Sequence, residues 1–208
     1  MKKSNTFGYV RVPKTGSHTL SFYLPKQPKY YTYGLFHYPY TVLESFVPEC
    51  NWITFGRDPF QLYCSFYFFM QHRIHKQKAL TNPLAYTHHN EKNIELITNN
   101  ASIEEFLTEC PKGQFLPYFW LPMQPNDFDF VGITEDMDRS LHVFNRMFNL
   151  NVKNTVYNNN PSKKVNEKYV LRKGIESKFR KDNALEFELY ALATEKFSNL
   201  WETWAYKN

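Results

Sequence analysis

The alternation of strand-like runs with helical segments is the feature that most constrains this chain. Four runs rich in aromatic and β-branched residues are typical of strands: Phe7–Val12, Tyr33–Tyr38, Asn51–Gly56 and Phe128–Ile133. Each run is followed by a segment with helical character, at 17–24, 40–46, 60–77 and 135–148. Strands that alternate with helices predict an α/β fold in which helices flank a short parallel sheet.

The remaining segments carry local boundary signals. Asp58 and Pro59 are suited to the N-cap and first position of a helix, and Ser102 with Glu105 forms a capping-box pattern. From Glu167 onward, two helices are expected to meet near 181–183, the second ending near Trp204. Two segments are expected to be irregular: 80–101, and the proline-rich 115–125.

The composition indicates a globular protein with a sizeable core. Of its 208 residues, 42% are hydrophobic and 18% aromatic, which excludes a disordered or fibrous chain. The net charge of +5 is small and its charges are scattered, so a small anionic ligand fits better than nucleic acid. No apolar stretch approaches the roughly 18 residues of a membrane span, and no signal region is evident, so we expect a soluble, cytoplasmic protein. This length predicts one domain over 1–208.

Metal and disulfide chemistry find little support in the sequence. The three cysteines, Cys50, Cys64 and Cys110, are widely spaced and form no CxxC pair, which favours a reducing compartment without a disulfide framework or structural zinc. The histidines outside the motifs described below show no HExxH pattern, and no metal site is expected: His72, His75, His88, His89 and His142.

The segment PKTGSHTL at 13–20, between the first strand and helix, has the character of a phosphate-binding loop. Gly16 allows the backbone to approach a ligand, and the amides of the helix start can donate to an anion. Further donors come from Lys14, Thr15, Ser17 and Thr19. The lysine precedes the glycine, so the ATP-binding pattern GxxxxGK[ST] is absent. An ordinary strand-to-helix turn with a solvated lysine is the alternative interpretation.

Arg57 and Ser65 form a second candidate phosphate site. Arg57 leaves the carboxyl end of the third strand, where ligands of open α/β sheets gather, and Ser65 lies two turns into the following helix. A guanidinium fork together with a hydroxyl can bind a phosphate. The alternative is that Arg57 pairs with Asp58 or with a helix end.

In sequence order, the segments PKTGSHTL, RDPxxxxxS, FVGITEDMDRSL and DNALEFELYALATEKF resemble the sulfotransferases that use 3′-phosphoadenosine 5′-phosphosulfate (PAPS). The resemblance is to the carbohydrate-type branch, and the order VRVPKT, HYPY, RDP, SKK is most similar to the uronosyl (heparan and dermatan) 2-O-sulfotransferases. It implies a P-loop-like sulfotransferase architecture and covers nearly the whole chain. Residues 78–125 are least alike and are expected to be a substrate-side insertion.

The resemblance also implies roles for individual residues. The loop matching the 5′-phosphosulfate site comprises Lys14, Thr15, Gly16, Ser17, His18 and Thr19, and the pair matching the 3′-phosphate site is Arg57 and Ser65. A cofactor-covering loop would be Ser162, Lys163 and Lys164. His37 matches the catalytic histidine, and Arg11 matches an arginine expected to bind substrate. Two positions depart from the family: His18 replaces a small hydroxyl residue, and an HGH pattern is reduced to Leu35-Phe36-His37.

These residue types suit sulfuryl transfer. A base must take the proton of the acceptor hydroxyl, and a cation must stabilise charge on the leaving phosphate; His37 and Lys14 could fill these roles without a metal. We therefore expect transfer from PAPS to a carbohydrate hydroxyl. An ATP-dependent P-loop kinase and a non-catalytic nucleotide- or glycan-binding protein remain the alternatives.

Overall fold

The computed structural model describes residues 5–16, 18–26, 31–34, 37–47, 49–77, 91–154 and 172–206, with only the backbone described at 18 and 73–77. The chain divides into two compact units. The first comprises Met1–Asp58, Gly113–Tyr157 and Leu185–Asn208, and the second comprises Pro59–Lys112 and Asn158–Ala184. That 1–208 is a single domain stays a prediction. The substrate-side role of 78–125 also stays a prediction; the second unit contains this segment up to Lys112, and the first unit contains it from Gly113.

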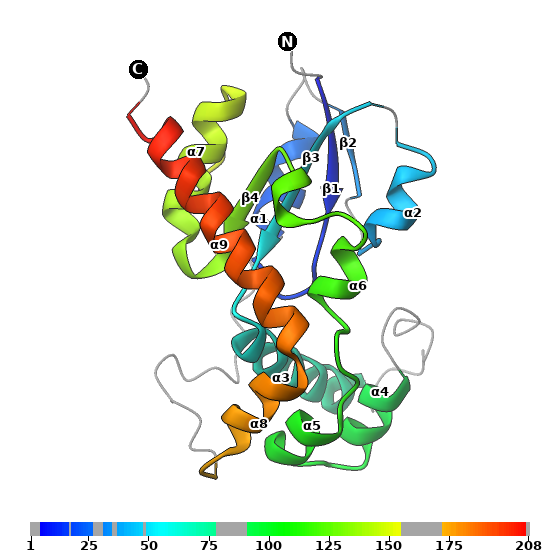
Figure 1. Cartoon of the computed structure of the whole chain (residues 1–208). Coiled ribbons are helices and arrows are strands. Elements are labelled where there is room, and N and C mark those ends of the chain that lie inside the picture. The colour runs from blue at the N-terminus through cyan, green and yellow to red at the C-terminus, as the bar shows by residue number, and fades with distance from the viewer. Residues whose placement is uncertain are drawn as a thin grey trace. The chain divides into compact units, whose positions relative to one another are not determined.

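The first unit contains a four-stranded parallel sheet (Figure 1). Its strands are β1 (Thr6–Val10), β2 (Tyr31–Tyr33), β3 (Asn51–Gly56) and β4 (Phe130–Ile133), in the order β2-β1-β3-β4. The prediction of an α/β fold with a short parallel sheet flanked by helices is confirmed.

The second strand is the element most displaced from its prediction, since it ends at Tyr33 and does not continue to Tyr38. Gly34 has a φ of 81°, and a Cβ at this position would collide with the Tyr9 carbonyl. The backbone therefore leaves the strand through a conformation that favours glycine. His37 consequently lies in the connection after β2 instead of in a strand.

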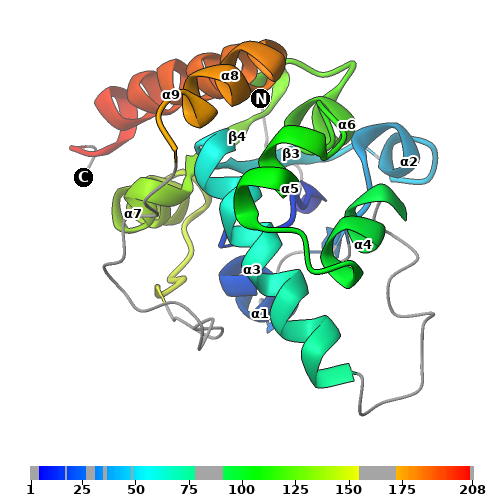
Figure 2. The ribbon, with the colours of Figure 1, turned by 90° about the horizontal axis from the view of Figure 1, so that it is seen from below.

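One face of the sheet is built from aromatic side chains that pack against α7 (Met137–Phe148). Phe7 of β1 lies 5.8 Å from Phe144, centroid to centroid, and 4.9 Å from Phe148. Phe130 of β4 lies 5.0 Å from the same Phe144. Figure 2 shows α1 (His18–Tyr23) on this side of the sheet as well. The alternation of side chains along each strand brings these rings to one face.

The opposite face packs against α6 (Leu116–Trp120) and α9 (Ala184–Trp204). The indole nitrogen of Trp120 donates to the Thr54 hydroxyl at 2.9 Å, and a Cβ at Gly56 would lie 3.3 Å from Trp120. The segment 115–125 was predicted to be irregular, which is wrong for α6. Pro117 falls in the first turn, where a helix does not need its N–H, so it does not prevent the helix.

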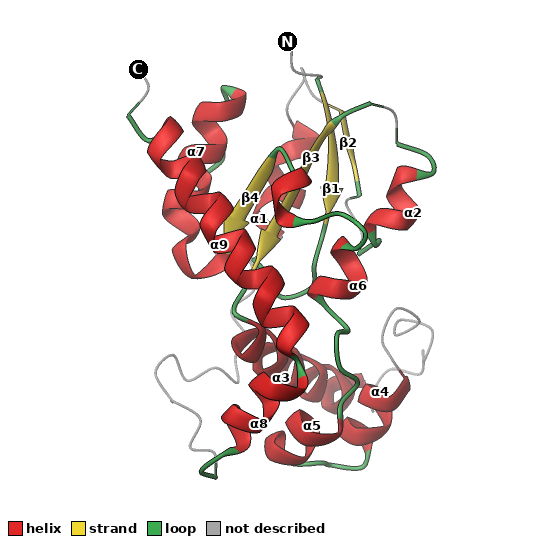
Figure 3. Ribbon diagram, viewed as in Figure 1, coloured by secondary structure: helices red, strands yellow, loops and turns green. Residues whose placement is uncertain are grey.

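Four helices make up the described part of the second unit: α3 (Pro59–Gln77), α4 (Glu91–Thr98), α5 (Ile103–Glu109) and α8 (Ile175–Asp182) (Figure 3). Aromatic contacts join them, including Tyr63 with Phe179 at 4.9 Å. The predicted capping box of α5 is confirmed. The prediction that 80–101 is irregular is wrong for Glu91–Thr98, which forms α4. Its buried residues, Asn93 and Ile97, recur at the i, i+4 spacing of one helix face.

A short helix, α2 (Tyr40–Glu44), follows β2, and three 3₁₀ turns complete the described elements: Leu24–Lys26, Pro125–Asp127 and Thr134–Asp136. Within the described ranges, every helix is too short or too polar to cross a membrane.

Candidate functional site

Three segments meet at the carboxyl edge of the sheet in the first unit. The loop 13–16 follows β1, Arg57 follows β3, and Thr134 follows β4. The Thr134 hydroxyl lies 2.9 Å from the Thr15 carbonyl oxygen and 2.8 Å from that of Gly56, so its single proton is shared between them. The parallel arrangement therefore brings the ends of three strands into one hydrogen-bonded cluster, where ligands of open α/β sheets bind.

Arg57 links the end of β3 to the loop. Its Nη1 donates to the Lys14 carbonyl oxygen at 2.9 Å, and its Nε lies 3.7 Å from the Glu135 carboxylate. Only 14% of the Arg57 side chain is exposed. The sequence alone leaves open a pairing of Arg57 with Asp58 or with a helix end. The structure shows an ion pair with Glu135, a carboxylate from the segment after β4.

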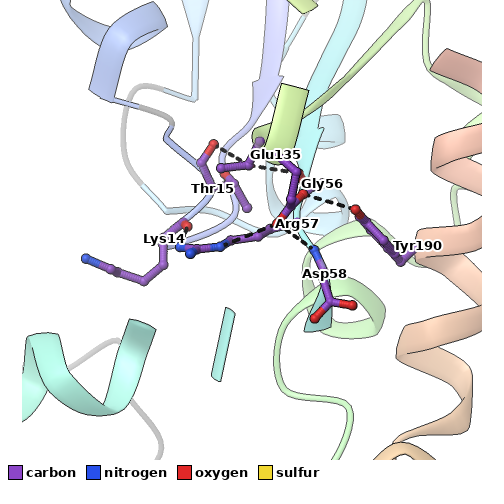
Figure 4. Close-up of polar contacts among 8 residues, drawn as sticks. Lys14, Thr15, Gly56, Arg57, Asp58, Glu135 and Tyr190 are labelled. Carbon is purple, nitrogen blue, oxygen red and sulfur yellow. Dashed lines mark hydrogen bonds and ion pairs between the residues drawn. The ribbon is translucent and has the colours of Figure 1, made fainter. Parts of the chain in front are cut away.

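Glu135 is held from two further sides. The Asp58 backbone amide donates to Glu135 Oε1 at 3.2 Å, and the Tyr190 hydroxyl, from α9, donates to Oε2 at 3.0 Å (Figure 4). Burial, reinforced by the neighbouring carboxylate of Glu135, raises the pKa of Tyr190 well above its usual value. Tyr190 therefore remains a protonated donor to Glu135 at neutral pH.

Lys14 has an unusual backbone conformation, with a φ of 64°. Within the described residues, the other non-glycine positions with positive φ are asparagines, Asn100 and Asn149, which tolerate it better. A lysine in the left-handed region costs about 1–2 kcal/mol, and strain of this kind concentrates at functional sites. In Figure 4 the Lys14 side chain extends away from Arg57, while its carbonyl faces the guanidinium.

Gly16 also has positive φ, at 69°, and its carbonyl accepts the Thr19 amide at 3.2 Å as α1 begins. The Thr15 side chain is fully buried, and its hydroxyl donates to the Val12 carbonyl at 2.9 Å. Thr19 is 5% exposed. Of the loop residues expected to bind phosphate, Thr15 and Thr19 are thus buried. The Thr15 hydroxyl closes the loop on itself, so its side chain supports the loop conformation.

His37 contacts the segment that leads from β1 into this loop. Its Nδ1 lies 2.9 Å from the Arg11 carbonyl oxygen and, since a carbonyl can only accept, Nδ1 donates. In the neutral imidazole the lone pair then resides on Nε2, which is the tautomer that a general base at Nε2 requires. Phe119 of α6 faces the ring, with centroids 6.5 Å apart.

Arg11, the residue expected to bind substrate, is only 7% exposed. Burial lowers the pKa of its guanidinium, although its neighbour Tyr9 acts in the opposite direction. Its backbone holds His37, whereas its side chain has little surface to offer a substrate.

Several predicted site residues are not placed by this geometry. Ser162, Lys163 and Lys164 lie outside the described residues, as does Ser17, and of His18 only the backbone is described. Ser65 is partly exposed on α3 and belongs to the second unit, so its pairing with Arg57 stays a prediction.

Three residues of the site, Thr134, Glu135 and Tyr190, were not predicted individually from the sequence. The first two had a signal, because they directly follow a predicted strand at the edge where Arg57 was expected. Tyr190 had none, since its partner Glu135 is 55 positions away in the sequence.

Within the described ranges, no three residues among His, Cys, Asp and Glu gather in a way that could hold a metal ion. The chain matches no protein-family model, and searches of curated proteins and of solved structures found no match.

Proposed function

We propose that this protein is a sulfotransferase with a P-loop-like fold that transfers a sulfuryl group from PAPS to a carbohydrate hydroxyl. One observation carries the proposal. Segment 11–14 receives a hydrogen bond from His37 at its first residue and one from Arg57 at its last. Arg11 and Lys14 are three residues apart, so their Cα atoms are separated by at most about 10–11 Å. The imidazole and the guanidinium are therefore anchored within the length of one small ligand. From the order of the sequence motifs, we assign His37 the role of the base and Arg57 that of a phosphate ligand.

The donor set suits PAPS. Lys14 and Arg57 provide two cations at one strand edge, and the positive φ values at Lys14 and Gly16 produce a compact turn of the kind whose amides can bind an anion. Arg57 would hold the 3′-phosphate by a charge-assisted fork. The Thr15 hydroxyl does not contribute in its present orientation, because it donates to Val12.

In the proposed reaction, His37 and Lys14 have different roles. PAPS would supply the sulfuryl group together with a phosphate as leaving group. His37 Nε2 would take the proton of the acceptor hydroxyl, a role that the bond from Nδ1 to Arg11 favours by defining the tautomer. Lys14 would stabilise the negative charge that develops on the phosphate oxygen as its bond to sulfur breaks.

Two alternatives make different predictions. A P-loop kinase would need a GK[ST] hydroxyl for Mg²⁺, and this loop has no such pattern. A non-catalytic binding protein would keep the anion site and would not require His37.

Binding and turnover experiments separate these possibilities. Calorimetry should show that adenosine 3′,5′-bisphosphate binds far more tightly than AMP or ATP. Arg57→Ala should weaken bisphosphate binding about 10- to 100-fold and leave AMP binding nearly unchanged, as expected for loss of a charge-assisted contact. Equal affinity for AMP and the bisphosphate in the wild type would contradict the proposal.

Turnover is tested with labelled PAPS and desulfated heparan and dermatan oligosaccharides. His37→Ala should lose about 10²- to 10⁴-fold in rate and keep its bisphosphate affinity. His142→Ala is a matched control, because His142 also contacts a backbone carbonyl, that of Ala205 at 3.3 Å. If the wild type binds bisphosphate tightly but sulfates none of these acceptors, the binding-protein alternative is favoured.

A further inference from the structure

Glu135 lies between Arg57 and α9. Its Oε1 faces the Arg57 Nε at 3.7 Å and accepts the Asp58 amide at 3.2 Å, whereas its Oε2 accepts the Tyr190 hydroxyl at 3.0 Å (Figure 4). Both carboxylate oxygens are therefore engaged, from different directions. A carboxylate held on both oxygens has little freedom to rotate, which makes it a rigid partner for the guanidinium.

Two contacts on different nitrogens constrain the orientation of Arg57. Nη1 donates to the Lys14 carbonyl at 2.9 Å, and Nε faces Glu135. A hydrogen bond at Nη1 and a longer ion-pair contact at Nε restrict the orientation of the planar guanidinium. Bidentate binding of a phosphate is favoured when that orientation is restricted beforehand. An arginine with four freely rotating bonds would lose that rotamer freedom on binding an anion, at a cost in affinity.

The electrostatic effect of Glu135 opposes anion binding. Its carboxylate places a negative charge beside the cation, which by itself weakens attraction for a phosphate. Because the Glu135 side chain is 38% exposed, solvent screens part of this effect. The structure thus combines a modest electrostatic penalty with a fixed guanidinium, an arrangement that favours orientation over total charge.

We propose that Glu135 is the positioning residue of Arg57, and that Tyr190 in turn positions Glu135, so that a residue of α9 controls the geometry of the phosphate site. The identity of the anion, a nucleotide 3′-phosphate, rests on the proposed function. The positioning of Arg57 by Glu135 and Tyr190 does not.

The ligand-free test follows the Arg57 Nε proton by NMR, with Arg57→Ala used to assign its resonance. Tyr190→Phe removes one hydroxyl and keeps the ring, so the variant should fold. Tyr190→Phe should accelerate exchange of this proton with solvent about 3- to 10-fold, as expected when the hydrogen bond from Tyr190 to Glu135 is lost. Glu135→Gln should accelerate the exchange at least as much. Tyr206→Phe is the matched control, since Tyr206 lies two residues beyond the end of α9 and is 81% exposed. Unchanged exchange in both Tyr190→Phe and Glu135→Gln would overturn the proposal.

The ligand test is a double-mutant cycle that measures adenosine 3′,5′-bisphosphate and AMP by calorimetry. Tyr190→Phe should weaken the bisphosphate about 3- to 10-fold in the wild-type background and have no effect in the Arg57→Ala background, because its action passes through Arg57. AMP should be unaffected in both. A purely structural role would weaken binding equally in the two backgrounds and would overturn the positioning role. Failure of the wild type to bind bisphosphate would refute the proposed function alone, and the exchange experiment would still decide the role of Glu135 and Tyr190.

Discussion

Thr134→Val should loosen the loop at 13–16, because the Thr134 hydroxyl connects three strand ends. The substitution keeps the shape of the side chain and removes the proton shared by the Thr15 and Gly56 carbonyls, at 2.9 and 2.8 Å. One hydrogen bond contributes about 0.5–1.5 kcal/mol, and two part-buried carbonyls lose a donor here. We therefore expect the free energy of unfolding to fall by about 1–2 kcal/mol.

The assay can be confined to the first unit. All four tryptophans lie in that unit, so their fluorescence during urea unfolding reports on it selectively. Hydrogen exchange adds a local measurement at the Thr19 amide, which donates to the Gly16 carbonyl at 3.2 Å. A loss of about 1–2 kcal/mol corresponds to exchange that is about 5- to 30-fold faster.

Thr203→Val is the matched control. The Thr203 hydroxyl donates to the Asn199 carbonyl at 2.7 Å, but within one exposed helical turn, so its loss should cost no more than about 0.5 kcal/mol. If Thr134→Val behaves like Thr203→Val in stability, and exchange of the Thr19 amide does not change, then Thr134 does not connect the strand ends in solution.

Three further predictions concern stability. In urea unfolding, Glu186→Ala should cost about 2–5 kcal/mol, because the buried carboxylate of Glu186 accepts two backbone amides where α6 begins. The control Glu188→Ala, at an exposed position, should cost under about 0.5 kcal/mol. Equal losses in the two variants would show that Glu186 does not stabilise the start of α6. Gly132→Ala should cost about 1–3 kcal/mol, because its Cβ would collide with the Phe55 ring, and a melting temperature equal to that of the wild type would show that the ring moves aside without penalty. Burial raises the pKa of the Cys50 thiol from 9.0 to about 12, so the thiol of the unfolded chain ionises first as the pH rises. The stability that this group contributes is therefore complete below pH 9 and is lost between pH 9 and 12. In urea unfolding, the stability of Cys50→Ala should fall less steeply over that range than that of the wild type, and an equal fall in both would exclude the pKa shift.

Local signals in the sequence determine much of this fold. The limits of β3 are those of the NWITFG run, and the capping box of α5 is present because Ser102 and Glu105 need only each other. The sequence also placed Arg57 at the carboxyl end of the third strand, and in the parallel sheet this end lies beside the loop that follows β1. These inferences succeed because each depends on residues within a few positions or on a rule of chain topology.

Only the tertiary structure decided the contacts that complete the site. Glu135 reaches the Asp58 amide across 77 positions, and Tyr190 reaches Glu135 across 55. Helix α6 likewise receives its N-terminal acceptor from Glu186, 70 positions away, which stabilises a helix at Leu116–Trp120 within a proline-rich segment expected to be irregular. Hydrophobic periodicity and turn chemistry act over about four residues and cannot select one distant carboxylate among many. That selection is made when the sheet and its helices pack, because packing alone brings these side chains within hydrogen-bonding distance.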